Sequence, residues 1–214
     1  MKELTRIFLV RHGQTDWNKD KVFRGLADRP LSDAGRAEAL AVGEKLKDER
    51  VDAIYASPLI RARQTVEPLA RWKHRKIQPL PGVIDIDYGD WSGRADAAVE
   101  KAYPKLYRAW KKRPATVRFP HGESLAQVAA RALRALQTVA RAHPGQTVVV
   151  ASHRVPCKVM VLKLLGLPLS RFWDVRQDVA CINLFEYQPP RVIVHHLNDI
   201  CHLRELPQRI TADF

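Results

Sequence analysis

Residues 7–10, Ile-Phe-Leu-Val, form an uninterrupted apolar run that stops abruptly at Arg11, His12 and Gly13. A run of this kind is typical of a strand that is buried on both faces, as in a parallel sheet. In open α/β sheets, ligands collect just beyond the carboxyl ends of the strands. A guanidinium and an imidazole at that place suit an anion, although the three residues alone are more simply explained as the polar end of a strand.

Further strands are predicted at residues 53–56, 148–151, 182–187 and 192–194. Between these segments, apolar residues recur at the three- and four-residue spacing of helices. A chain in which strands alternate with helices favours a mainly parallel sheet that is covered by helices on both faces. We therefore predict an α/β fold, a three-layer sandwich around a mainly parallel central sheet.

Helices are predicted at residues 59–70, 125–140 and 155–162. For the first of them, Ser57 is the expected N-cap and Pro58 the expected first helical residue. The second has the spacing of a capping box between Ser124 and Gln127 at its start.

Residues from about 86 to 120 break this alternation. They carry aromatic residues on short mixed segments: Trp91, Tyr103, Tyr107 and Trp110. This pattern favours a small helical insert over the sheet edge rather than a second domain. A chain of 214 residues is long enough to bury a sizeable core and fits one domain, so we expect residues 1–214 to form a single domain.

The net charge of +13 would suit nucleic acid, an anionic membrane surface or a small anionic substrate. The basic residues cluster at 71–76 and 108–113, on expected helix ends, where solvated cations are ordinary. No zinc-finger, KH or RNP pattern accompanies them. No apolar run approaches the roughly 18 residues that cross a bilayer. We therefore interpret the clusters as solvated helix ends and expect neither nucleic acid nor a membrane as partner.

The first residues lead straight into the predicted strand, so we expect no signal peptide and a cytoplasmic protein. Cys157, Cys181 and Cys201 lie far apart and form neither a disulfide framework nor a metal knuckle. The histidines lack the HExxH spacing. We expect no metal and no cofactor. The apolar segments 182–187 and 192–194 near the sheet edge suggest a homodimer as a further hypothesis.

Four other segments can converge on Arg11-His12-Gly13. They are residues 15–18 (Thr-Asp-Trp-Asn), 57–65 (Ser-Pro-Leu-Ile-Arg-Ala-Arg-Gln-Thr), 85–93 (Asp-Ile-Asp-Tyr-Gly-Asp-Trp-Ser-Gly) and 151–153 (Ala-Ser-His). Each follows a predicted strand or an expected turn, so all of them can lie at one edge of a parallel sheet.

With these motifs, the chain resembles the histidine phosphatase superfamily, in the branch of the phosphoglycerate mutases and related phosphatases. The match runs from residue 4 to about residue 203. It also includes residues 31–35 (Leu-Ser-Asp-Ala-Gly), 122–125 (Gly-Glu-Ser-Leu) and 197–199 (Leu-Asn-Asp). This combination is specific for the family and much less specific for the substrate.

The resemblance implies a phosphomonoesterase in which His12 attacks phosphorus and forms a phosphohistidine intermediate. Arginine provides planar, bidentate donors for phosphate oxygens, so Arg11 and Arg61 are the expected clamps. A protonated His153 is an expected further donor. The attacking nitrogen of His12 must be unprotonated, so its other ring nitrogen is expected to donate to a backbone carbonyl. The expected substrate-binding residues are Asn18, Arg24, Gly25, Tyr88 and Arg154.

The general acid is expected at Asp85, where relatives carry a Glu that is one methylene longer. The alternative is that Asp85 is a turn residue and that Asp87 or solvent provides the proton. Either carboxyl must reach about 3 Å from the ester oxygen.

Two other positions depart from the family pattern. Relatives usually have Glu where this chain has Gln14, which removes a negative charge beside the pocket. Relatives often have Gly where this chain has Arg154. If Arg154 faces the pocket, it favours a second anionic group on the substrate; if it faces outward, it is only a helix N-terminal residue in an unfavourable place relative to the dipole.

Several segments are closest to the metal-independent phosphoserine phosphatases, in particular residues 86–93, 152–156, 169–173 and 201–203. Those enzymes carry a histidine where this chain has Tyr88, a residue linked to substrate recognition. Phosphoserine is therefore a candidate among small phosphorylated substrates. Two alternatives stay open: a cofactor-dependent phosphoglycerate mutase, and a non-catalytic polyanion-binding protein.

Overall fold

A six-stranded sheet in the order β3-β2-β4-β1-β5-β6 forms the centre of the computed structural model, which describes residues 3–18 and 22–206. The strands are β1 (Thr5–Arg11), β2 (Ala53–Ala56), β3 (Ile77–Pro79), β4 (Thr147–Ser152), β5 (Ile182–Gln188) and β6 (Arg191–Asp199). The first four strands of that order pair in parallel, whereas β5 runs antiparallel to β1 and β6 antiparallel to β5. The predicted α/β fold with a mainly parallel sheet is confirmed.

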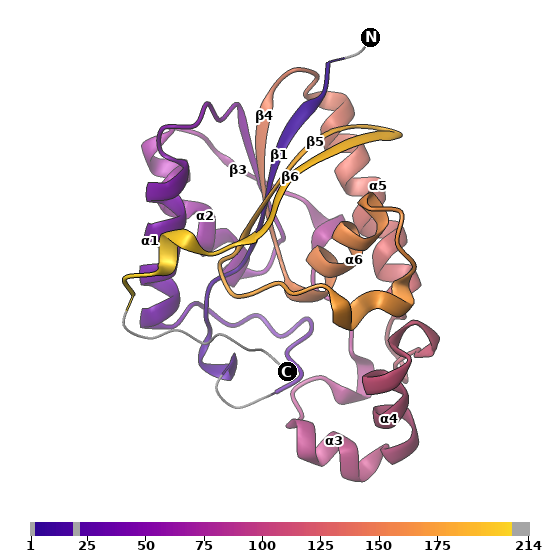
Figure 1. Cartoon of the computed structure of the whole chain (residues 1–214). Coiled ribbons are helices and arrows are strands. Elements are labelled where there is room, and N and C mark those ends of the chain that lie inside the picture. Colours follow the sequence, from indigo (N-terminus) through magenta and orange to yellow (C-terminus); the bar gives the residue numbers. More distant parts are fainter. Residues whose placement is uncertain (1–2, 19–21, 207–214) are drawn as a thin grey trace.

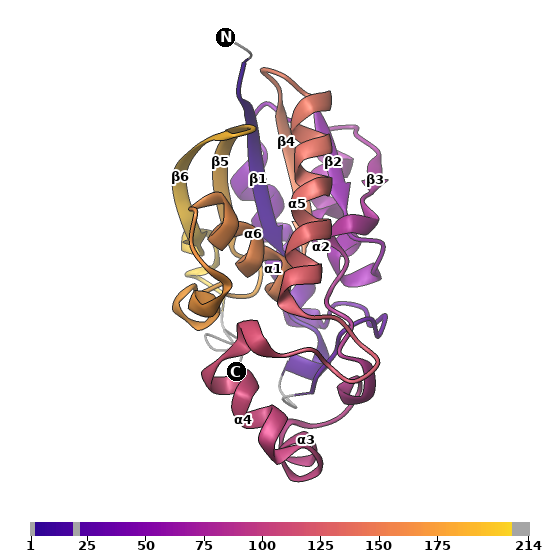
Figure 2. The ribbon, with the colours of Figure 1, turned by 90° about the vertical axis from the view of Figure 1, so that its right-hand side faces the viewer.

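Helices cover both faces of the sheet, which gives three layers (Figures 1 and 2). One face carries α1 (Asp33–Leu46) and α2 (Ile60–Trp72), and the other carries α5 (Leu125–Ala142) and α6 (Arg154–Leu164). In both views, α3 (Asp96–Ala102) and α4 (Pro104–Lys112) lie beyond the end of the sheet at which β1 finishes. No helix of the described residues is long and apolar enough to span a bilayer.

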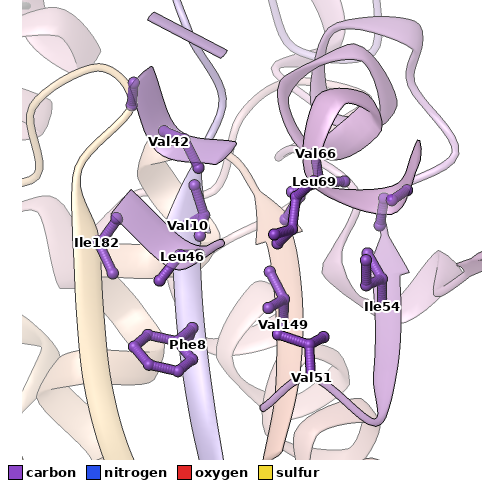
Figure 3. Packing of buried hydrophobic residues seen from close by; sticks show 14 of the residues in the cluster. Phe8, Val10, Val42, Leu46, Val51, Ile54, Val66, Leu69, Val149 and Ile182 are labelled. Atoms are coloured by element: carbon purple, nitrogen blue, oxygen red, sulfur yellow. The ribbon is translucent and has the colours of Figure 1, made fainter. Parts of the chain in front are cut away.

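The apolar run of β1 is explained by burial on both faces. Phe8 and Val10 point to the α1/α2 side, where they pack with residues such as Val42 and Leu46 (Figure 3). Ile7 and Leu9 alternate with them and belong to the cluster on the α5/α6 side. Successive side chains of a strand point to opposite faces, so a central strand between two helical layers needs apolar residues at every position.

The capping box at the start of α5 is confirmed by the bonds of Ser124 and Gln127. The prediction that Ser57 caps α2 and that Pro58 is its first residue was wrong, because α2 begins at Ile60 with Leu59 as N-cap. Ser57 instead continues the ladder of the sheet, where its N–H donates to the carbonyl oxygen of Ala151 at 2.9 Å. The sequence-based interpretation did not include α1 or the short strand β3.

The segment from 86 to 120 contains α3 and α4 and builds an aromatic cluster of its own. Trp91 and Trp110 are almost fully buried and both contact Phe119, at ring-centroid distances of 4.9 and 5.2 Å. The same cluster includes Leu125 of α5 and Val155 of α6, so the segment packs on the first turns of both helices. The predicted helical insert thus packs around a cluster that it shares with α5 and α6, next to the sheet end. The assignment of residues 1–214 to one domain stays a prediction, as does the homodimer, for which β6 lies at the sheet edge.

Gly89 fixes the turn that carries Tyr88, because its φ of +52° lies in the left-handed region. A Cβ at this position would approach the carbonyl oxygen of Pro120 to 1.9 Å. We expect Gly89→Ala to lower the free energy of unfolding by more than about 3 kcal/mol, since backbone strain of about 1–2 kcal/mol adds to a backbone clash.

Gly93→Ala is the matched control, because Gly93 also has a positive φ of +76° but a Cβ there meets nothing within 4 Å. Urea unfolding of both variants measures the difference. Equal losses of stability in the two variants would contradict the proposed role of the Gly89–Pro120 contact.

Candidate active site

The parallel pairing of β1 with β4 places two histidines side by side. Arg11 is opposite Ser152 in the register, so His12 and His153 are the next residues on the two strands. The backbone N–H of His12 donates to the carbonyl oxygen of Ser152 at 2.9 Å. The two imidazole rings lie 5.1 Å apart between centroids, and both are buried.

The imidazole of His12 is held in one tautomer. Its Nδ1 lies 2.6 Å from the carbonyl oxygen of Gly13. A carbonyl oxygen can only accept, so Nδ1 carries the proton and Nε2 keeps the lone pair. Burial lowers the pKa of His12 well below its ordinary value, and the charges of Arg61, Arg11 and Arg24 lower it further. The expected bond from His12 to a backbone carbonyl is therefore present, and it leaves the lone pair on Nε2.

The hydrogen bonds of His153 are those of a neutral ring, whereas the sequence analysis expects a protonated donor towards phosphate. Its Nδ1 accepts from Nε of Arg61 at 3.2 Å, and its Nε2 lies 2.7 Å from the hydroxyl of Ser57. A nitrogen that accepts from a guanidinium has no proton, so Nε2 donates to Ser57. Burial and the positive charge of Arg61 lower the pKa of His153 well below its ordinary value. The sequence contains Arg61, Arg24 and Arg11, but it does not show that their charges all act on the one buried ring of His153.

Arg61 is fully buried and holds together three segments of the site. Its two terminal nitrogens donate to the carbonyl oxygens of Ala27, at 2.7 Å, and of Gly25, at 2.9 Å. One of them also lies 3.1 Å from Oδ2 of Asp85, in a buried ion pair. The guanidinium thus orients both the predicted acid and the loop that carries Arg24.

Arg11 is also fully buried, and one terminal nitrogen donates to the carbonyl oxygen of Gln177 at 2.6 Å. Burial lowers the pKa of Arg11 to about 10, and the nearby charge of Arg154 contributes in the same direction. The guanidinium of Arg11 therefore stays charged at neutral pH. Burial and the charge of Arg154 nevertheless make this positive charge less favourable than it is in water.

The carboxylate of Asp85 has a fixed orientation. Oδ1 accepts from the backbone N–H of Ile86 at 2.9 Å, and Oδ2 faces Arg61. Arg131 of α5 holds the preceding backbone, since it donates to the carbonyl oxygens of Gly82, Ile84 and Asp85 at 2.6–3.0 Å. The sequence analysis did not identify Arg131. The sequence feature that could have pointed to it is Glu123, with which Arg131 forms an ion pair at 2.8 Å.

A small pocket brings together part of the predicted site. Its lining includes His12, Arg24, Gly25, Asp85, Tyr88 and Arg154. Four predicted site residues do not line it, namely Arg11, Arg61, His153 and Asn18. Arg11 and His153 are the chain neighbours of His12 and Arg154, which do line it, and Arg61 contacts Asp85. Oδ1 of Asn18 accepts from the N–H and the hydroxyl of Thr15, at 2.8 and 3.0 Å. This fixes the orientation of the Asn18 carboxamide.

Arg154 faces the pocket, which decides between the two orientations that the sequence allowed. It is the first residue of α6 and only 8% exposed. Burial raises the pKa of Tyr88, which is 4% exposed, and the nearby charge of Arg154 opposes this change. Burial and the charges of Arg11 and Arg154 lower the pKa of Arg24, another lining residue, to about 9.

Gln14 is uncharged at a position where the sequence analysis expects a glutamate. Glu38 of α1 places a carboxylate next to Gln14. The carboxylate of Glu38 accepts from the backbone N–H of Gln14 at 2.7 Å and also from its side-chain amide. Burial raises the pKa of Glu38, while the bonds from Gln14 oppose this change. The sequence signal for Glu38 is its helical spacing from Gly35 and Val42 on the buried face of α1.

Within the described ranges 3–18 and 22–206, no group of three or more histidine, cysteine, aspartate or glutamate side chains could hold a metal ion.

Comparison with known proteins agrees with this geometry. The model of the histidine phosphatase superfamily (branch 1) matches residues 7–200. Phosphoserine phosphatase 1 of Hydrogenobacter thermophilus is 38% identical over 202 residues, which cover 94% of this chain and 96% of that protein. The metal-independent phosphoserine phosphatase of Arabidopsis thaliana is 29% identical, with 94% of this chain and 84% of that protein covered. The structure of YhfR from Bacillus stearothermophilus is similar with a TM-score of 0.89 and 28% identity, over 93% of this chain and 99% of that one.

The chain belongs to the histidine phosphatase superfamily, branch 1. It is a phosphatase with a phosphoglycerate mutase-like fold.

The two neutral histidines predict how stability depends on pH. Their pKa values in the folded protein lie below the value of about 6.5 for the unfolded chain, so the unfolded chain binds protons first as the pH falls. Their contribution to stability is complete above pH 6.5 and is lost below it, by up to about 1.4 kcal/mol per pH unit for each histidine.

Urea unfolding between pH 7.5 and 5 in phosphate-free buffer measures this slope. We expect it to become shallower in His12→Gln/His153→Gln, because the two buried rings are then absent. An equally steep slope in the double variant would contradict the neutral state of the two buried rings.

Proposed function

We propose that the protein hydrolyses small phosphate monoesters through a phosphohistidine on Nε2 of His12. The observation that carries this proposal is the bond from Nδ1 of His12 to the carbonyl oxygen of Gly13, in a ring that lines the pocket. It leaves a neutral ring with its lone pair on Nε2. A covalent intermediate of this kind divides one difficult substitution into two easier ones.

Arg11, Arg61, Asn18 and His153 hold the phosphate oxygens in this proposal. A phosphate dianion needs its charge neutralised before a neutral nitrogen can approach phosphorus in line. The buried guanidinium groups of Arg11 and Arg61 provide that charge when their terminal nitrogens exchange their present carbonyl and carboxylate partners for phosphate oxygens. A bound dianion also favours the protonated form of His153, which would then donate as the sequence analysis expects.

Asp85 is the proposed general acid, which protonates the leaving alkoxide and then activates water. Its support is its position in the lining of the same pocket as His12. Asp87, the alternative, does not line the pocket. One of its oxygens accepts from the backbone N–H of Gly89 at 2.8 Å, as in an ordinary turn.

Phosphoserine is the first substrate to test, since the two sequence relatives described above are named phosphoserine phosphatases. One of them is named as metal-independent, and we propose the same for this chain. The residues proposed here for nucleophile, acid and phosphate binding supply each step of the reaction without a metal.

His12→Ala should abolish hydrolysis of 4-nitrophenyl phosphate, because His12 carries the only imidazole among the described lining residues of the pocket. Wild-type turnover should be unaffected by excess chelator. Brief mixing with substrate and acid quench, followed by peptide mass spectrometry, should find one phosphoryl group on the peptide that contains His12. His195→Gln is the control for the loss of a histidine. Turnover that requires a divalent metal, or phosphorylation at another residue, would refute the mechanism.

Asp85→Asn should reduce kcat for alkyl phosphates by about 10²–10⁴-fold, the usual contribution of general acid–base catalysis. The first turnover of 4-nitrophenyl phosphate should fall much less, because its leaving group needs no proton. Asp87→Asn is the matched control, with the same chemical change two residues away. If Asp87→Asn has the larger effect, the acid is Asp87 and the assignment to Asp85 is wrong.

A further inference from the structure

Two short motifs late in the chain, residues 197–199 and 201–203, take no part in the chemistry described so far. The first is the end of β6, and the second is the helical turn that follows it. Both motifs contact residues 177–181, the segment that leads into β5. The contacts of this segment with the catalytic strand end give the two motifs a role.

The segment 177–181 holds the backbone of Arg11 and of His12. The N–H of Arg11 donates to the carbonyl oxygen of Cys181 at 3.1 Å, and the N–H of Ala180 donates to the carbonyl oxygen of His12, also at 3.1 Å. The strand β4 holds the same two residues from the other side of β1. The position of the His12 backbone therefore depends on this segment as much as on β4.

The carbonyl oxygen of Gln177, in the same segment, accepts from the guanidinium of Arg11 at 2.6 Å. The side chain of Gln177 forms two reciprocal amide bonds with Asn183 of β5, at 2.7 and 2.8 Å. Nδ2 of Asn183 also donates to the carbonyl oxygen of Leu9 at 3.1 Å. Both amide side chains are buried, where hydrogen bonds are stronger than in water. Gln177 is thereby fixed relative to β1.

Asn198 of the first motif holds the segment from β6. The pairing of β6 with β5 is irregular opposite Asn183, and Asn198 has a φ of +53° there. Its backbone N–H donates to Oδ1 of Asn183 at 2.9 Å. Its carboxamide accepts from the N–H of Asp178 at 2.7 Å and donates to the Asp178 carboxylate at 2.9 Å. Such bulges are frequent next to active sites, where they redirect a side chain, and asparagine tolerates a positive φ better than most residues.

His202 of the second motif holds the other end of the segment. Its Nε2 lies 3.1 Å from the carbonyl oxygen of Ala180. A carbonyl oxygen can only accept, so Nε2 is the donor. Ala180 is fully buried and has a φ of +51°, a conformation that alanine adopts only when its surroundings impose it. His202 thus supports the residue whose N–H holds the carbonyl oxygen of His12.

Resting on the proposed phosphatase function, we propose that Asn198 and His202 are positioning residues, which keep His12 in line with phosphorus through the segment 177–181. Neither residue belongs to the described lining of the pocket, so both act on the reaction through this segment. In-line attack needs aligned atoms, and a displacement of about 1 Å can cost about 10²-fold in rate. The same segment holds the guanidinium of Arg11 until the phosphate arrives.

Single-turnover formation of phosphohistidine from 4-nitrophenyl phosphate tests the role of Asn198. Asn198→Gly removes the carboxamide but suits the φ of +53°, so backbone strain does not add to the effect. We expect the rate constant at saturating substrate to fall by about 10- to 100-fold, because the attacking nitrogen is less well aligned. The Kd of inorganic phosphate, measured by calorimetry, should change much less, because both arginine clamps are still present.

A conservative pair of variants tests the role of His202. His202→Leu removes the donor to Ala180 and should slow the same step by about tenfold, the effect of one lost hydrogen bond. His202→Gln keeps an N–H that can donate to the same carbonyl oxygen, so it should recover most of the rate. A purely structural role would lower the melting temperature of both variants without this difference in rate.

Asp52→Ala is the control for a loss of stability alone. Asp52 accepts from the N–H of Thr147 at 2.9 Å, where β4 begins, whereas the active site lies where β4 ends. This variant should have a lower melting temperature and an unchanged rate constant.

The outcomes separate this inference from the proposed function. If folded Asn198→Gly and His202→Leu form phosphohistidine at the wild-type rate, the positioning role is refuted and the phosphatase stands. If Asn198→Gly does not fold, the His202 pair decides. If the wild type forms no phosphohistidine on His12, the proposed function fails, and this inference fails with it.

Discussion

The parallel pairing of β1 with β4 is the interaction on which the rest of the site depends. Its register places Arg11 opposite Ser152, so both strands end together and deliver His12 and His153 to one point. The pairing is stable because both strands are buried between two helical layers, which requires apolar residues throughout. A shift of this register would separate the two imidazole rings and remove Arg61 from its place against His153.

A concentration of buried positive charge follows from this arrangement. Burial and the charges of Arg61, Arg11 and Arg24 lower the pKa of both histidines well below the ordinary value. In the proposed reaction, the same charges that suppress a proton on His12 would also attract a phosphate dianion, so one electrostatic feature would both prepare the nucleophile and favour the substrate.

The aromatic cluster of the segment from 86 to 120 connects this charge to the fold. It consists of large buried rings, among them Trp91, Trp110 and Phe119, and it supports Tyr88 at its border with the pocket. The insert therefore borders the pocket beside the sheet end.

The sequence by itself determined the layered α/β fold, the strand that ends at His12 and the set of residues that gather there, because apolar periodicity and strand ends are local properties. It also placed Ser124 and Gln127 in a capping box, which involves only neighbouring residues. It did not determine that Ser57 continues the sheet ladder and bonds His153, that Glu38 replaces the charge missing at Gln14, or that Arg131 fixes the backbone of Asp85. The direction of Arg154 and the neutrality of His153 were decided only by the tertiary structure. Each depends on how many charged and aromatic groups from distant segments converge on one buried volume, and no single segment contains that information.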